Sequence, residues 1–206
     1  MNRSEGRLAK DVATHAGVFA FLVVLMFAFN SFSHGTQDLY PTFLQKNLQL
    51  TPKMVSLIAI VFNIGALLGG ILFGSLSERI GRRRAILIAA VLSVPIIPLW
   101  AFSKTVPLLA LGGFLMQFMV QGAWGVIPAH INELSPDTLR GFFPGFAYQL
   151  GVVFAASSAQ MEALMAKHLS YSHAMGIFAA TVLAAGAVAI AFGPEAHGIR
   201  FGRDSN

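Results

Sequence analysis

Long apolar stretches, separated by short polar or charged segments, follow one another along most of the chain. A helix needs about 20 predominantly apolar residues to cross the hydrocarbon core of a bilayer. Six stretches reach that length, and they lie at about 13–44, 53–74, 84–103, 106–129, 142–165 and 172–193. The pattern therefore predicts an all-α membrane protein with six transmembrane helices.

Helix-starting and helix-bending residues refine two of these stretches. Thr51-Pro52 precedes the second stretch, and a capping hydroxyl followed by proline is typical of a helix start. Pro95 and Pro98 lie inside the third stretch, where proline removes a backbone hydrogen bond and bends a helix. We expect a sharp start to the second helix and a bend in the third.

Small residues recur at a spacing of four in two of the stretches. This spacing lets the backbones of neighbouring membrane helices approach closely, although it indicates no particular function. The pairs are Gly65 and Gly69, Gly70 and Gly74 in the second stretch, and Gly141 and Gly145 entering the fifth.

The composition agrees with a membrane protein. Of the 206 residues, 55% are hydrophobic and 11% are charged, whereas a soluble domain carries about 25% charged residues. The chain has no cysteine, which excludes disulfides and thiolate metal sites.

The basic residues predict the orientation of the chain. Six spans place both termini on one side of the membrane. If that side is cytoplasmic, ten of the 14 lysines and arginines lie inside, including every arginine, and four lysines lie outside: Lys46, Lys53, Lys104 and Lys167. Positive charge collects in short cytoplasmic loops, so both termini are predicted to be cytoplasmic. The net charge of +5 is thus a signal of topology, and we expect no nucleic-acid partner.

The loop GSLSERIGRRRA joins the second and third spans. Gly74, Glu78, Gly81, Arg82 and Arg83 stand in it at the spacing G-x-x-x-[DE]-x-x-G-R-[KR]. This spacing resembles the signature loop of the major facilitator superfamily. Gly81 permits a tight turn, and the acid and the arginines can form charge-assisted pairs with neighbouring loops and helix ends. A positive-inside stop signal would explain the arginines, but neither the glycine spacing nor the acid.

The next loop on the same side, NELSPDTLRGFFPG, carries Glu133 and Arg140. These residues resemble the E…RG pattern at the equivalent loops of the same transporters. The resemblance implies that Glu133, Arg140 and the arginines of the preceding loop form an ionic latch on the cytoplasmic side. The alternative is a solvated loop whose surface ion pairs contribute under about 1 kcal/mol each.

The resemblance also predicts the domain organisation. Major facilitators consist of two six-helix halves with the substrate site between them, and Glu78 replaces the aspartate that is more common in the first copy of the signature loop. We therefore expect a C-terminal half, with a cytoplasmic linker remnant at 1–12, a six-helix bundle at 13–193 and a cytoplasmic tail at 194–206. Its partner would be an N-terminal six-helix half or a second copy of the chain.

The first span ends in the polar run NSFSHGTQDLYPT, residues 30–42. On a helical projection its polar side chains share an arc of about 140°, and they are Asn30, Ser33, His34, Gln37 and Asp38. Inside a membrane such a face must look into protein or a water-filled cavity. The alternative is the solvated outer end of a long helix.

His34 and Asp38 are one helical turn apart, so their side chains can meet. A carboxylate beside an imidazole favours the protonated ring. The pair is therefore predicted to carry protons.

The spacing of this run resembles the seventh-helix signature of the monocarboxylate (lactate/pyruvate):proton symporters in the sialate:proton symporter group. That signature reads N-x-x-[ST]-H-x-[ST]-Q-D-x-x-x-T, and all seven defined positions from Asn30 to Thr42 agree. The resemblance implies that Asn30 contacts substrate and that His34 and Asp38 handle protons. It implies a supporting role for Ser33, Thr36 and Gln37.

Polar residues also occur inside other predicted spans. Each could line a transport cavity or join two helices by hydrogen bonds, and they are Asn63, Gln117, Gln121, Gln149 and Glu162. His130 is expected in a loop at the cytoplasmic mouth.

No lysine or arginine lies in the middle of a span, although a carboxylate substrate needs a cationic partner. The resemblance places that arginine in the N-terminal half.

These patterns predict a transporter half that moves small monocarboxylates with protons by alternating access, in the plasma or inner membrane. Its expected partners are the lipid bilayer, protons and a small organic anion, with no cofactor and no metal. A truncated, inactive fragment and a transporter of a sugar or sialic acid remain alternatives. An enzyme is not expected, because the chain has neither H-E-x-x-H nor G-x-S-x-G.

Overall fold

The computed structural model describes residues 13–195, and over that range the regular elements are helical. The first elements are α2 (Ala16–Gln37), α3 (Tyr40–Thr42), the π-helical turn η1 (Phe43–Asn47), α4 (Pro52–Ile80), α5 (Arg82–Ser93), the 3-10 turn η2 (Val94–Ile96) and α6 (Ile97–Phe102). The remaining elements are α7 (Val106–Trp124), α8 (Ile127–Leu134), the 3-10 turn η3 (Asp137–Leu139), α9 (Phe143–Ala155), α10 (Ser158–Met165) and α11 (Tyr171–Phe192). The expected linker at 1–12 and residues 196–206 of the expected tail lie outside the described residues.

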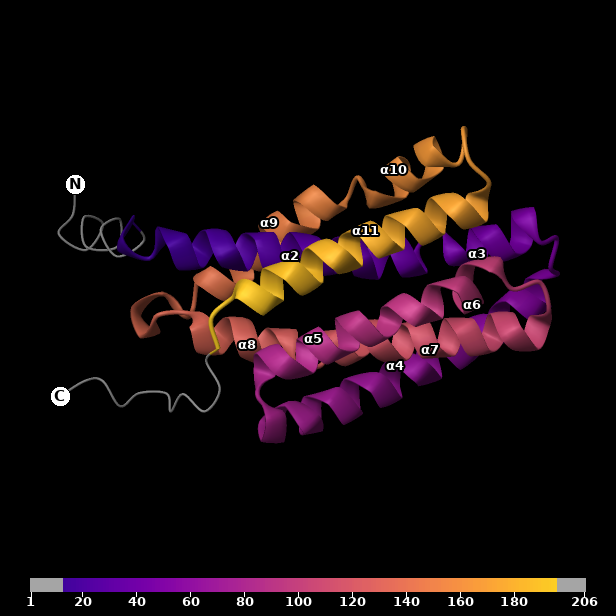
Figure 1. Ribbon diagram of the computed structural model, residues 1–206. Coiled ribbons are helices and arrows are strands. Elements are labelled where there is room, and N and C mark those ends of the chain that lie inside the picture. The colour runs from indigo at the N-terminus through magenta and orange to yellow at the C-terminus, as the bar shows by residue number, and fades with distance from the viewer. Residues whose placement is uncertain (1–12, 196–206) are drawn as a thin grey trace.

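The helices run back and forth along one long axis (Figure 1). The start of α2, the α4–α5 turn, the α8–α9 connection and the end of α11 lie at one end of the bundle. The connections before α4, before α7 and before α11 lie at the opposite end. Segments that are distant in the sequence are therefore brought to the same end.

Five helical segments among residues 13–195 are long and apolar enough to cross a membrane, and they are Ala16–Asn47, Pro52–Ile80, Arg82–Phe102, Val106–Leu134 and Tyr171–Phe192. They correspond to five of the six predicted stretches. A helix can cross water-free hydrocarbon because it satisfies its own backbone hydrogen bonds. With five such segments among the described residues, the chain is a multi-pass membrane protein. The second helix continues beyond the predicted end at 74, because its cap is Gly81 and not the last apolar residue.

The predicted stretch at 142–165 is not one continuous helix. The chain turns at Ala156 and Ser157, which separates α9 from α10. The Ser157 hydroxyl donates to the carbonyl of Phe154 at 3.2 Å, and a serine that bonds its local backbone offers an alternative to the helix. Together α9 and α10 make the pass between α8 and α11 (Figure 1).

The expected helix boundaries are confirmed at two places. Thr51 caps α4, and its hydroxyl accepts a hydrogen bond from the Met54 amide at 3.4 Å. Pro95 and Pro98 interrupt the third span, since the 3-10 turn η2 separates α5 from α6 there. A missing amide donor at each proline explains why the regular helix stops and restarts.

Helices α4 and α7 pack backbone to backbone. A Cβ atom at Gly65 or Gly69 would collide with the carbonyl oxygen of Phe114 or Phe118 on α7, respectively. The two glycines are one turn apart and so are the two carbonyls, which confirms the first small-residue seam. The expected seam at Gly141 and Gly145 is wrong: a Cβ at either would meet open space.

The glycine that brings the fifth pass close to its neighbour is Gly151. A Cβ there would lie 2.5 Å from the Cβ of Met26 and 2.9 Å from the amide nitrogen of Phe27. Helix α9 therefore packs directly on the backbone of α2. Spacing alone favoured the wrong glycines, because it does not say which face of a helix has a neighbour.

We predict that Gly69→Ala lowers the free energy of unfolding by about 1–3 kcal/mol, since the new methyl group overlaps the Phe118 carbonyl. Gly70→Ala is the matched control, because its Cβ would lie 3.5 Å from the Gln121 carbonyl, an ordinary contact. The control should be neutral or gain up to about 1 kcal/mol from helix propensity. Thermal unfolding in detergent, followed by tryptophan fluorescence, measures both. Equal stability of the two variants would contradict close α4–α7 packing.

Candidate functional site

The polar run of residues 30–42 covers the last two turns of α2, its C-cap Asp38 and the short helix α3. The predicted pair is present there: His34 Nδ1 and Asp38 Oδ2 lie 3.0 Å apart. Their side chains are 40% and 48% exposed, respectively. The pair is therefore within reach of water or of a neighbouring surface, as a group that exchanges protons must be.

A second set of polar groups on α2 bonds to α7. Gln37 Nε2 donates to Gln117 Oε1 at 2.9 Å, and Gln117 Nε2 donates to the Thr36 hydroxyl at 3.3 Å. One turn further along α7, Gln121 Nε2 lies 3.5 Å from the Ser33 hydroxyl, which also accepts from Gln37 at 3.1 Å. We call these five residues the α2–α7 ladder.

The α2–α7 ladder fixes how the two helices sit together. Gln117 and Thr36 are buried, at 2% and 1% exposure. A buried amide without a partner costs about 1–3 kcal/mol, so these groups hold one another in a single register. The ladder thus holds the end of α2 that carries His34 and Asp38, although none of its hydrogen bonds involves either residue.

Asn30 lies deeper on α2 than the pair does. Its side chain is only 3% exposed, and its amide donates to the Met26 carbonyl of the same helix at 2.7 Å. In this conformation Asn30 is closed to any ligand. Substrate contact at Asn30 would require the helices around it to move apart.

Asn63 and Gln149 do not join the α2–α7 ladder. Asn63 is exposed on α4 and donates to the Ala59 carbonyl of its own helix at 2.7 Å. Gln149 is exposed on α9. Both residues face outward from the bundle of described residues, so any role in a substrate pathway needs a further surface opposite them.

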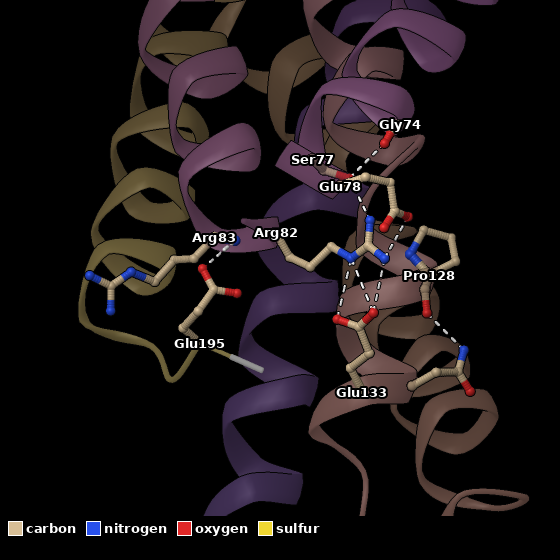
Figure 2. Close-up of polar contacts among 9 residues, drawn as sticks. Gly74, Ser77, Glu78, Arg82, Arg83, Pro128, Glu133 and Glu195 are labelled. Atoms are coloured by element: carbon tan, nitrogen blue, oxygen red, sulfur yellow. Dashed lines mark hydrogen bonds and ion pairs between the residues drawn. The ribbon is translucent and has the colours of Figure 1, made fainter. Parts of the chain in front are cut away.

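A cluster around Arg82 occupies the end of the bundle where α4 turns into α5 (Figure 2). Arg82 donates from Nε and Nη2 to the carboxylate of Glu133 on α8, at 3.1 and 2.9 Å. Its Nη2 also lies 2.8 Å from Glu78, and its Nη1 donates to the Ser77 hydroxyl at 2.6 Å. The Ser77 hydroxyl donates in turn to the Gly74 carbonyl at 2.7 Å. We call these five residues the Arg82 cluster.

The Arg82–Glu133 pair is buried, since the two side chains are 9% and 8% exposed. The forked contact uses the planar shape of the guanidinium group. Every nitrogen of the group has a partner, as a buried charge requires. The structure therefore joins the two loops that the sequence singled out, and an open pocket of about 480 Å³ beside them is lined by Arg82, Ala129, Asn132, Glu133 and Arg140.

Gly81 makes the turn between α4 and α5 with φ of +95°, a conformation that side chains with a Cβ rarely adopt. The next turn is tied to the end of α11. The Arg83 amide donates to the Glu195 carboxylate at 3.1 Å, and its guanidinium donates to the Gly193 carbonyl at 2.9 Å. The expectation of a glycine turn is confirmed, and the partner of Arg83 is the chain after α11.

Arg140 braces its own loop. It pairs with Asp137 and donates to the carbonyls of Asn132 and Ser135, at 3.1 and 3.2 Å. The expectation that His130 lies in a loop is wrong, because it is buried in α8 with 0% exposure. Helix α8 continues past the apolar stretch up to Leu134, which carries His130 into the interior.

Two further residues carry buried polar groups: Tyr40, which was not predicted as a site residue, and Glu162, one of the polar candidates inside the predicted spans. The Tyr40 hydroxyl donates to the Leu109 carbonyl at 3.0 Å, and its ring stacks on Trp100 at 5.4 Å between centroids. This contact anchors α3 just beyond the His34–Asp38 pair. Glu162, on α10, is 1% exposed.

Five membrane-length helices among residues 13–195, joined by polar contacts between α2 and α7 and by a buried arginine pair at one end, define a multi-pass membrane protein as the class. The chain belongs to the sugar (and other) transporter family, whose model matches residues 11–196, and so to the major facilitator superfamily.

Known relatives include transporters of different solutes. A carboxylic acid transporter protein homolog from Saccharomyces cerevisiae is 39% identical over 150 residues, which are 72% of this chain and 24% of the relative. A probable 4-methylmuconolactone transporter from Cupriavidus pinatubonensis is 26% identical over 91% of this chain and 40% of the relative. The human facilitated glucose transporter member 3 is 33% identical over 56% of this chain and 24% of the relative.

A solved structure of a double tryptophan mutant of XylE has the same fold. It superposes with a TM-score of 0.62 at 18% identity, over 91% of this chain and 46% of the XylE chain. The chain thus spans less than half the length of these relatives.

We predict that Arg82→Ala lowers the free energy of unfolding by about 3–5 kcal/mol, because it leaves Glu133 buried and unpaired. Arg84→Ala is the control: Arg84 is exposed on the same turn and its loss should change stability by less than about 0.5 kcal/mol. Combining Arg82→Met with Glu133→Gln should restore much of the loss. Thermal unfolding in detergent measures all three variants, and a double variant no more stable than Arg82→Ala would contradict the pairing.

Proposed function

We propose that this chain is part of a symporter that moves small monocarboxylates of the lactate and pyruvate type together with protons, by alternating access. The observation that carries the proposal is the His34–Asp38 contact of 3.0 Å on the polar face of α2. An imidazole and a carboxylate in contact can take up and release one proton at the pH of a cell. The α2–α7 ladder beside them keeps this pair in place.

Proton coupling suits an anionic substrate. Moving one elementary charge across a membrane costs or yields about 2.3 kcal/mol per 100 mV. A carboxylate that travels with one proton moves no net charge, so its transport avoids opposition by a negative interior. One proton and one anion then cross the membrane together without net charge.

The names of the relatives support this substrate class. The yeast relative, at 39% identity, is described as a carboxylic acid transporter homolog. The second candidate is a sugar, because the human relative at 33% identity transports glucose. Sialic acid also remains a candidate. Competition between labelled lactate and excess glucose or sialic acid separates these alternatives.

We propose that α9 and α10 together form a sixth span and that both termini are cytoplasmic. The charges support this orientation: Arg82, Arg83 and Arg84 lie at one end of the bundle, and lysines such as Lys46 and Lys104 belong to connections at the other end. Positive charge favours the cytoplasmic face. The Arg82 cluster is then a cytoplasmic latch that breaks and re-forms during transport, in a plasma or inner membrane.

A complete site needs a second six-helix half, either another polypeptide segment or a second copy. The α2 face supplies a histidine, a carboxylate and amides, whereas an anion also needs a cation in a dry cavity. The outward-facing Asn63 and Gln149 would then line the surface between the halves. The alternative is an inactive fragment, which would bind no carboxylate even with a second half present.

The orientation predicts which positions a membrane-impermeant maleimide reaches in intact cells. The chain has no native cysteine, so Lys46→Cys and Arg84→Cys each introduce one thiol, and both positions are exposed. Lys46→Cys should be labelled from outside, and Arg84→Cys only after the cells are permeabilised. The reverse pattern would contradict the proposed topology.

We predict that His34→Ala removes the acid stimulation of lactate or pyruvate uptake, measured with labelled substrate in vesicles that also contain a second half. Coupling between two ligands is typically about 5- to 150-fold, so the loss should be of that order. Thr181→Ala is the control, because Thr181 is exposed on α11 and its hydroxyl bonds its own helix at Ile177. A pH profile in His34→Ala like that of the unmodified chain would contradict the proposal.

A further inference from the structure

Glu162 is a buried carboxyl residue. It lies on α10 with 1% exposure, and among residues 13–195 neither of its oxygens has a hydrogen-bond partner. By contrast, Glu133 is similarly buried but is paired with Arg82. Glu133 thus has a charged partner at one end of the bundle, whereas Glu162 has none among the hydrogen-bonding groups described around it.

Gly35 makes room for this carboxyl group. A Cβ at Gly35 would lie 2.7 Å from Glu162 Oε1 and would collide with the ring of Phe178 on α11. Glu162 therefore packs directly on the backbone of α2, one residue after His34. The Phe178 ring covers the same spot and helps to exclude water.

The titratable groups around Glu162 come from two helices. Asp38 on α2 and Tyr171 on α11 both interact with Glu162 electrostatically. His34 is next to Gly35 and pairs with Asp38. The cluster holds two carboxyl groups, one phenol and one imidazole, and two nearby carboxylates resist being ionised together.

An ionised carboxylate costs far more to bury than a neutral acid when nothing pairs with it. No hydrogen-bond donor in the described part of the chain offsets that cost at Glu162. Burial without a hydrogen-bond partner therefore favours the neutral carboxylic acid at Glu162 over the carboxylate. Water must reach the group before this proton can leave.

We propose that Glu162 is a proton-binding residue of the transport cycle, loaded when α10 packs on α2 and unloaded when α10 moves away. The proposal rests on the proposed proton-coupled function and adds a second proton site beside His34 and Asp38. On unloading, the Glu162 O–H bond breaks, the proton passes to water or to Asp38, and a carboxylate remains. Reloading takes a proton from water on the other side.

The break between α9 and α10 allows this movement. The chain turns at Ala156 and Ser157, so α10 is a helix of only eight residues that can shift without carrying α9 with it. Helix α9 stays anchored, because Gly151 packs on the backbone at Met26. A movement of α10 alone could therefore expose Glu162 to water while α9 keeps its place on α2.

The test is infrared spectroscopy of the full chain in lipid vesicles, which detects the C=O stretch of a protonated carboxyl group. We expect this band at neutral pH, its loss in Glu162→Gln, and its retention in Glu133→Gln. Glutamine has the shape of the neutral acid, so Glu162→Gln should fold. The band should fall as the pH rises, since a carrier must release its proton.

Three results would overturn the proposal: no band at neutral pH, a band that survives Glu162→Gln, or a band unchanged at high pH. None of these measurements requires transport. If His34→Ala leaves the pH profile of uptake unchanged while the Glu162 band behaves as expected, the symport proposal fails and the assignment of a proton to Glu162 stands. If the band fails its test while uptake depends on His34, only the role of Glu162 is lost.

Discussion

Polar groups inside a bilayer find no water to bond to, and the arrangement of this bundle depends on that constraint. The α2–α7 ladder meets it by pairing amides across two helices, and the Arg82 cluster, at one end of the bundle, pairs charges that the protein itself buries. Both arrangements require close helix packing. Gly65 and Gly69 allow close packing on another face of α7, since α4 there touches the α7 backbone. The polar contacts and the small residues are therefore two parts of one solution.

The fold was largely predictable from the sequence, because membrane spans are set by length and hydropathy. The cap at Thr51 and the interruption at Pro95 are local chemistry, and both are as expected. The turn at Ser157 was missed, because the mean hydropathy of the stretch at 142–165 stays high although it contains a few small polar residues such as Ser157. Gly141 was favoured and Gly151 was overlooked for a different reason: a close helix contact depends on a partner that spacing does not identify.

The site was predictable only where its residues lie on one helix. His34 and Asp38 are a turn apart, so their contact follows from helical geometry. The partners on α7 were candidates, but only the fold shows that Gln117 meets Gln37. Glu162 was one of several polar candidates, and the sequence did not single it out, since its significance depends on the missing side chain at Gly35, on a different helix.

The tie between Arg83 and the chain after α11 joins two segments separated by 110 residues along the sequence. Helix α11 is one uninterrupted helix from Tyr171 to Phe192, and the chain directly after it is held at the α4–α5 turn. Phe178, which covers Gly35, lies further along the same helix. Because one continuous helix joins the two places, the packing over Gly35 and the arginine turn share a single rigid element.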